Sequence, residues 1–156
     1  MPVVDLASLK QVLAREQRLM GLDVGTKTVG VAVSDVSRSI ATPLETIERK
    51  KFNPTAQRLI ELADAHKIGA LIVGLPLQMD GSEGPRCQSV RDFAHELLKR
   101  RDMALAFHDE RLSTAAVERV LIGDADMSRK RRGEVVDRAA AAYILQGALD
   151  RLAREK

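Results

Sequence analysis

Apolar and polar residues alternate most regularly along residues 28–35, where three valines fall on one face of an extended chain. A shorter apolar run at residues 18–23 precedes this segment, and Gly25-Thr26-Lys27 separates the two runs. This spacing predicts a β-hairpin. A weaker run at residues 40–47 predicts a third antiparallel strand, and Pro43 indicates that this strand lies near a sheet edge.

The rest of the chain alternates between helical spacing and continuous apolar runs. The run at residues 68–75 is typical of a buried parallel strand, and a second short strand is predicted at residues 103–107. A polar and basic segment at residues 123–132 predicts a mobile loop. Helices are predicted over residues 53–67, around Val90–Leu98, behind a cap at Ser113 or Thr114, and over residues 135–152, where Ala139–Ala142 would allow close approach to the sheet.

Three strands in succession followed by an αβαβα pattern predict a single α/β domain over residues 18–156. Its sheet would be mixed and five-stranded, an antiparallel meander extended by parallel strands and flanked by helices. Residues 1–17 precede the first strand, and Leu6, Leu9 and Leu13 share one stripe of a helix predicted over residues 5–17. We expect this N-terminal helical extension to pack on the body of the domain.

Composition excludes several classes of protein. The 156 residues are 45% hydrophobic and 30% charged, which is ordinary for a globular domain and excludes wholesale disorder. Cys87 is the only cysteine, so no intrachain disulfide can form, and we expect a reducing, cytoplasmic environment. No apolar run approaches the ~20 residues that a membrane-spanning helix needs, so we expect no membrane partner.

The net charge is only +3, but the cations are clustered. Three basic clusters, Arg49–Lys51, Lys99–Arg101 and Arg129–Arg132, favour a polyanionic partner such as nucleic acid. The alternative is that each cluster is a solvated helix end. Aromatic residues are scarce, so a nucleic acid would be held mainly through its phosphates and shape rather than by base stacking.

Carboxylates occur where a parallel sheet binds its ligands, at the carboxyl ends of the strands. Asp23 ends the first predicted strand, Asp109 and Glu110 end the last, and Asp137 lies in the first turns of the final helix. Converging carboxylates repel one another unless a cation lies between them, and oxygen ligands suit Mg²⁺ or Mn²⁺. Such a site performs phosphoryl chemistry. The alternatives are a turn residue for Asp23, an ion pair for Glu110, and a complement to the helix dipole for Asp137.

Four segments carry a family resemblance, and they occur in the family's order across about residues 18–150. Together they resemble the YqgF family, ribonuclease H-like proteins described as pre-16S rRNA nucleases and as similar to Holliday junction resolvases. The segments are Met20–Ala32, Val73–Pro76, Phe107–Thr114, and Val136–Ala140 with Ile144-Leu145-Gln146.

The resemblance implies a ribonuclease H-like fold and a metal-dependent phosphodiesterase site. Its catalytic and metal-holding residues would be Asp23, Glu110 and Asp137, with Mg²⁺ or Mn²⁺ as cofactor. It also implies processing of the 5′ end of 16S rRNA during ribosome assembly. Classical resolvases carry their second acid one strand earlier, where this chain has Val73–Pro76.

Residues around these acids are expected to bind the substrate. Arg111 would meet phosphate oxygens through its planar guanidinium, or would pair with a neighbouring carboxylate. Ser113 and Thr114 would cap a helix whose amino end can receive phosphate. The full expected set is Thr26, Lys27, Arg111, Ser113, Thr114 and Arg132.

Two other functions remain open at the level of sequence. A Holliday junction resolvase acting on branched DNA would use the same acids, because RNA is discriminated by 2′-hydroxyl contacts that sequence does not locate. A non-catalytic assembly factor would bind rRNA or a pre-ribosomal particle without cleaving it. The chain is compatible with a monomer or a homodimer, although the two-fold symmetry of a junction favours a dimer for a resolvase.

Overall fold

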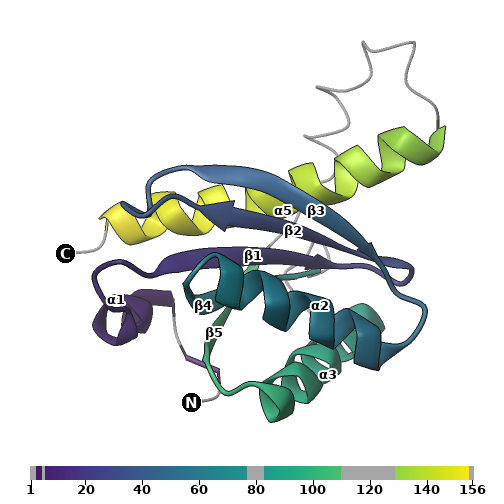
Figure 1. The fold of residues 1–156 in the computed structure, drawn as a ribbon, viewed down its shortest axis with the longest axis horizontal. Helices are drawn as coiled ribbons and strands as arrows, with labels where there is room; N and C mark the ends of the chain where they lie inside the picture. Colours follow the sequence, from purple (N-terminus) through teal and green to yellow (C-terminus); the bar gives the residue numbers. More distant parts are fainter. Residues whose placement is uncertain (1–2, 5, 77–82, 110–128, 155–156) are drawn as a thin grey trace.

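The computed structural model describes residues 3–4, 6–76, 83–109 and 129–154 (Figure 1). Five strands form one sheet in the order β3-β2-β1-β4-β5. The first three are an antiparallel meander, and the last two join the other side of β1 in parallel, so the predicted mixed sheet is confirmed. The strands are β1 (Arg18–Val24), β2 (Thr28–Ser34), β3 (Ala41–Glu48), β4 (Ile68–Leu75) and β5 (Ala104–Asp109).

The predicted hairpin is formed by β1 and β2. Its turn is closed by the Gly25 amide, which donates to the Thr28 carbonyl oxygen at 2.8 Å. The third strand, β3, lies at the sheet edge and contains Pro43, as the sequence indicated. Proline has no amide hydrogen to donate to a second neighbour, so an edge strand accommodates it.

Helices cover both faces of the sheet (Figure 1). On one face lie α2 (Phe52–Ala65) and α3 (Pro85–Arg100), whose apolar side chains join the three valines of β2 in one buried cluster. On the other face lies α5 (Arg129–Arg154), which packs on a second cluster that includes Leu19, Ala32 and Ile72. The alternation of strand side chains thus supplies two cores.

Strand β4 is buried on both faces, which explains its continuous apolar sequence. Leu71 and Val73 belong to the cluster beneath α2 and α3, whereas Ala70 and Ile72 belong to the cluster beneath α5.

The single cysteine, Cys87, is also buried, in the first of these clusters. Within the described residues, no helix has the length and apolar character needed to cross a membrane.

The N-terminal prediction was partly wrong. Residues 5–17 do not form one helix: a 3₁₀ turn η1 (Leu6–Ser8) leads into a four-residue helix α1 (Leu9–Val12). Leu13 has an extended backbone, and the Gln17 side chain accepts the Ala14 amide at 2.8 Å, so a local turn replaces the next helical turn. The segment nevertheless packs on the body, with η1 against β5 and α5.

The start of the last helix was also predicted wrongly. We expected a loop through residue 132 and a helix from residue 135, but α5 already begins at Arg129. Arginine and lysine are good helix formers, so the basic run has the propensity to extend the helix although it lacks apolar periodicity. The helix expected behind Ser113 or Thr114 lies outside the described residues, as do residues 123–128 of the expected loop.

Candidate functional site

Asp23 is the penultimate residue of β1 and is half-buried. It lies on the sheet face covered by α5, because Gly21, two residues earlier on the same face, contacts that helix directly. A Cβ built on Gly21 would lie 2.8 Å from the Leu145 Cβ and 3.0 Å from the Ala141 carbonyl oxygen. The candidate carboxylate therefore lies at the carboxyl end of a central strand, next to α5.

Glycines occupy the strand positions on both sides of Asp23. Gly30 of β2 is its partner in the antiparallel pair. On the other side, the parallel register aligns Leu22 with Val73, so Gly74 is the next position along β4 beside Asp23. Neither of these two neighbouring residues has a side chain.

The direction of α5 relates Asp137 to Asp23. Gln146 contacts the start of β3: its side chain accepts the Ala41 amide at 2.8 Å and donates to the Ser39 carbonyl at 2.9 Å. Ala41 pairs with Ser34, whose hydroxyl accepts the amide of Leu19 near the start of β1. Moving along α5 from Gln146 toward its amino end therefore means moving along β1 toward its carboxyl end.

Residue 137 lies one helical turn before Ala141, in the direction of Asp23. It is also eight residues after Arg129, the first residue of α5. The favourable effect of a helix dipole on a carboxylate falls off within the first turn. The dipole interpretation of Asp137 therefore loses its physical basis, because this residue lies two turns inside the helix.

The carboxyl end of β5 lies at the same end of the sheet as Asp23. Asp109 is its last residue and pairs with Leu75, and His108 pairs with Gly74. His108 is half-buried and faces α5, where a Cβ built on Gly147 would lie 3.0 Å from the imidazole Nε2. Glu110, the next residue along the chain, lies outside the described residues.

The turn after Asp23 presents two of the expected substrate-binding residues. Thr26 and Lys27 are both exposed. The other expected residues are not described by the structure: Arg111, Ser113 and Thr114 lie between the described ranges, and of Arg132 and Asp137 only the backbone in α5 is described. Among the described residues, no three His, Cys, Asp or Glu side chains form a group that could hold a metal ion.

Two arginines that contact this turn were not among the predicted site residues. Arg49 was noted only as part of a basic cluster, but its guanidinium Nη1 donates to the Gly25 carbonyl oxygen and stacks 4.9 Å from the centre of the Phe93 ring. Burial lowers the pKa of this guanidinium, which still remains protonated at neutral pH. Arg86 of α3 donates to the Val24 carbonyl oxygen at 3.4 Å. Both contacts join segments far apart in sequence, so no local pattern indicated them.

Comparison with known proteins gives a consistent family. The family model described as RuvX, Holliday junction resolvase, matches residues 17–151. A protein of Paramagnetospirillum magneticum is 59% identical over 150 residues, covering 96% of each chain. One of Rhodospirillum rubrum is 56% identical over 156 residues, covering 100% of this chain and 97% of its own. Both relatives carry the name "Putative pre-16S rRNA nuclease".

Solved structures identify the fold. The chain resembles Thermus thermophilus RuvC, solved in complex with a Holliday junction substrate, with a TM-score of 0.55, 14% identity, and coverage of 90% of this chain and 98% of that one. It also resembles the fowlpox virus Holliday junction resolvase, with a TM-score of 0.54, 13% identity, and coverage of 87% and 100%. At such identities the likeness concerns the fold alone, and it confirms the ribonuclease H-like α/β architecture.

Proposed function

The chain belongs to the RuvX family, also called YqgF, and from this premise we propose that it is a metal-dependent nuclease that cleaves structured RNA. Its substrate in this proposal is the precursor of 16S rRNA, and the reaction is hydrolysis of phosphodiester bonds at the 5′ end. The observation that carries the proposal is the match, over nearly the whole of both chains, to relatives named as nucleases of this precursor.

Asp23, Glu110 and Asp137 are the proposed catalytic and metal-holding residues. For Asp23 the support is its position: it is half-buried at the carboxyl end of β1, between two glycines of the neighbouring strands. The course of α5 supports it for Asp137, since that residue lies one turn from the Gly21 contact in the direction of Asp23. For Glu110 the support is its place in the sequence, directly after the last residue of β5.

These three carboxylates would hold Mg²⁺ or Mn²⁺, because their oxygen atoms are the donors that such hard cations prefer. When bound, the metal supplies activation of the attacking water and stabilisation of the leaving oxygen. The protein's own contribution is to hold the carboxylates on rigid elements. Asp23 lies within a central strand, and Asp137 lies in a helix that is packed directly on that strand.

Some of the proposed substrate-binding residues lie in described parts of the chain. Thr26 and Lys27 support the proposal by their exposure on the turn that follows Asp23, where a lysine can reach phosphate oxygens. Arg132 lies one turn before Val136 at the amino end of α5, the end that leads past Asp23. Arg111, Ser113 and Thr114 complete the proposed set.

The wider setting follows from the same proposal. The protein acts in the cytoplasm on a pre-ribosomal particle, and its nuclease domain is residues 18–156. Residues 1–17 act as an extension of this domain, since η1 packs against β5 and α5 and the Val4 amide donates to the Leu105 carbonyl oxygen at 2.8 Å. The protein works as a monomer or as a homodimer.

A turnover panel tests the proposed function. The purified full chain is incubated with Mg²⁺ and three substrates: a 5′-extended 16S rRNA leader, an unrelated duplex RNA, and a four-way DNA junction. We expect cleavage of the leader, its loss on chelation with EDTA, and its loss in Asp23→Asn, which also controls for contaminating nuclease.

Two outcomes would favour the alternatives. Cleavage of the junction without cleavage of either RNA would support a resolvase, the activity in the description of the matching family model. Binding of the leader without cleavage of any substrate would support a non-catalytic assembly factor. Oligomeric state measured on the same preparation adds a second criterion, because a resolvase must engage a two-fold symmetric junction.

A further inference from the structure

The backbone that follows Asp23 is held from two other parts of the fold. Its turn is closed internally by the bond from the Gly25 amide to the Thr28 carbonyl oxygen. Three further donors bind carbonyl oxygens of the same short segment, at Val24, Gly25 and Lys27. These donors belong to Arg49, just after β3, and to Arg86, in the first turn of α3.

Arg49 binds the turn twice. Its backbone amide donates to the Lys27 carbonyl oxygen at 2.8 Å, and its guanidinium Nη1 donates to the Gly25 carbonyl oxygen. The guanidinium is itself held in place, because it lies 4.9 Å from the centre of the Phe93 ring, and Phe93 is buried in the core between the sheet and α3. Arg49 therefore joins the turn to a buried side chain of the core.

Arg86 of α3 binds the same segment. Its guanidinium Nη2 donates to the Val24 carbonyl oxygen at 3.4 Å, one residue after Asp23. This bond is longer than those made by Arg49, and the Arg86 side chain is exposed. The two arginines thus contact consecutive carbonyl groups, those of Val24 and Gly25, from two separate elements.

We propose that Arg49 and Arg86 are positioning residues, which clamp the backbone after Asp23 and so fix the position of its carboxylate. The inference rests on the proposed function, since it concerns a carboxylate that serves that chemistry. A group that holds a metal ion must be placed within about 0.5 Å of its productive geometry, which requires support from neighbouring residues. An arginine is suited to this task because its planar, permanently charged guanidinium donates in fixed directions.

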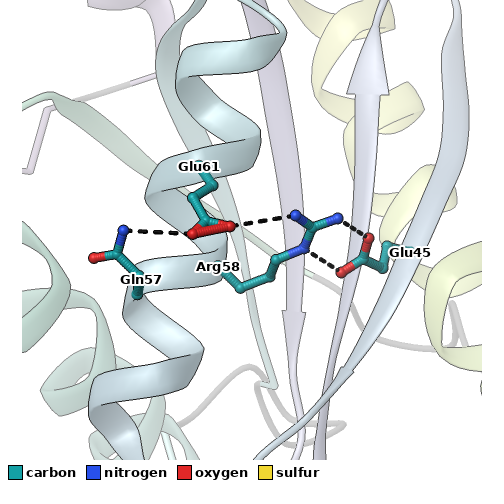
Figure 2. A network of polar contacts seen from close by, with 4 residues as sticks. All are labelled: Glu45, Gln57, Arg58 and Glu61. Atoms are coloured by element: carbon teal, nitrogen blue, oxygen red, sulfur yellow. Dashed lines mark hydrogen bonds and ion pairs between the residues drawn. The ribbon is translucent and has the colours of Figure 1, made fainter.

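The test compares the same substitution at two arginines. In Arg49→Lys the positive charge is retained, but the fixed fork that reaches Gly25 is removed. The matched control is Arg58→Lys, because Arg58 also joins β3 to the helices: it binds Glu45 of β3 at 2.7 and 2.9 Å and Glu61 of α2 at 3.4 Å (Figure 2). These two carboxylates belong to β3 and α2 rather than to the turn, so the control removes an arginine bridge of similar type at another place.

Two readouts are measured on each variant. The first is turnover of the leader RNA, for which we expect Arg49→Lys to lower kcat about 10- to 100-fold with KM within about three-fold of the wild type, as for supporting residues of metal sites. The second is hydrogen exchange at the Gly25 and Arg49 amides, which we expect to become about tenfold faster or more. Arg58→Lys should change neither readout by more than about two-fold.

The alternative outcomes are distinct. A raised KM with unchanged kcat and unchanged exchange would mean that Arg49 contacts the substrate, and would overturn the positioning role. Unchanged values throughout would overturn it as well. If Arg49→Lys fails to fold, Arg86→Lys takes its place, with the same expected fall in kcat on a smaller scale. If the wild type cleaves no substrate, the proposed function fails. Hydrogen exchange at the turn, measured together with Mn²⁺ affinity, then still decides whether the two arginines order this segment.

Discussion

Gly21 of β1 and Leu145 of α5 are in such close contact that a Cβ on residue 21 would lie 2.8 Å from the Leu145 Cβ. The same Cβ would lie 3.0 Å from the Ala141 carbonyl oxygen. Both neighbouring atoms belong to or adjoin the helix backbone, so neither can rotate away. The helix can rest on the strand at this distance only because residue 21 has no side chain. Gly21 lies two residues from Asp23, and Ala141 lies four residues from Asp137.

Gly21→Ala is therefore expected to push α5 away from the sheet. Overpacking of this kind costs about 1–3 kcal/mol, which lowers Tm by roughly 2–4 °C per kcal/mol in a domain of this size. Under the proposed function, turnover should fall more than RNA binding, because Asp137 moves with the helix. Chemical denaturation and thermal melting measure the loss of stability.

The matched control is Gly147→Ala, in the same helix. Its added Cβ would meet the His108 imidazole at 3.0 Å, a side chain that can rotate, whereas alanine favours a helix over glycine by about 1 kcal/mol. We expect a net change close to zero. A Gly21→Ala variant as stable as Gly147→Ala would mean that α5 adjusts freely, and that its close approach to β1 does not hold the candidate site together.

The sequence predicted the sheet well because burial imposes simple periodicities on strands. Alternation at residues 28–35 matched β2, and the continuous apolar run at residues 68–75 matched β4, which is buried by helices on both faces. The small residues Ala139–Ala142 correctly predicted close helix–sheet packing, now seen at Gly21. In these cases one physical constraint acts on consecutive residues, so the pattern can be recognised in the sequence.

The errors arose where no such constraint acts. The amino end of α5 lacks apolar periodicity, so its helix was predicted to begin at residue 135 instead of Arg129. The N-terminal apolar stripe predicted a long helix, although only Leu6 and Leu9 are buried and the helix ends at Val12. The contact of Arg49 with Gly25 joins residues that are 24 positions apart, and the contact of Arg86 with Val24 joins residues that are 62 positions apart. Both contacts therefore depend on tertiary structure alone.

Asp35 gives the fold a defined response to acid. Its carboxylate accepts the Ser37 hydroxyl and the Ser39 amide, each at 2.7 Å, and the Ile40 amide at 3.1 Å. These hydrogen bonds, the Ser37 hydroxyl first, lower the pKa of Asp35 from 3.8 to about 2. Because the folded-state pKa is depressed, the stabilisation is present above about pH 4 and is lost as the pH falls toward 2.

Asp35→Asn removes this titration but keeps an oxygen that can accept the two amides. We expect the variant to be somewhat less stable than the wild type at pH 6, and the difference in Tm to shrink as the pH is lowered from 4 to 2. Melting curves across that range check the sign. A difference that stays constant with pH would show that the charge of Asp35 contributes nothing to stability.

Two of the three basic clusters are expected to differ in their contribution to RNA binding. All three cations of Lys99–Arg101 have protein partners: Lys99 pairs with Glu96 at 2.9 Å, Arg101 pairs with Asp64, and Arg100 stacks 5.2 Å from the centre of the Phe52 ring. The cluster at Arg129–Arg132 lies at the amino end of α5, the end that leads past Asp23. The cluster at Arg129–Arg132 is therefore the better candidate for phosphate contacts.

Neutralising Arg129, Lys130, Arg131 and Arg132 with glutamine should weaken RNA binding regardless of sequence. The slope of log K against log salt should become less steep by about one unit for each phosphate that the variant no longer binds. The same change at residues 99–101 is the control and should leave the slope nearly unchanged. Filter binding at several salt concentrations measures both, and a slope unchanged from the wild type in the first variant would assign residues 129–132 to ordinary solvation.

Asp137→Asn separates a chemical role from a structural one. Asparagine is nearly isosteric with aspartate and has a similar helix propensity, and residue 137 lies beyond the first turn of α5, so folding should be preserved. Under the proposed function the substitution removes a metal ligand, which should abolish cleavage. It also removes one negative charge that repels the incoming phosphates, so RNA binding should be unchanged or tighter.

Melting temperature, RNA affinity and turnover are measured on one preparation, with Asp150→Asn, an exposed position in the same helix, as the control. Full activity in Asp137→Asn would remove this residue from the proposed site and leave only Asp23 and Glu110 as its acids. Lost activity with lost stability would instead indicate a structural role, whereas lost activity with intact folding and binding is the result that the proposal requires.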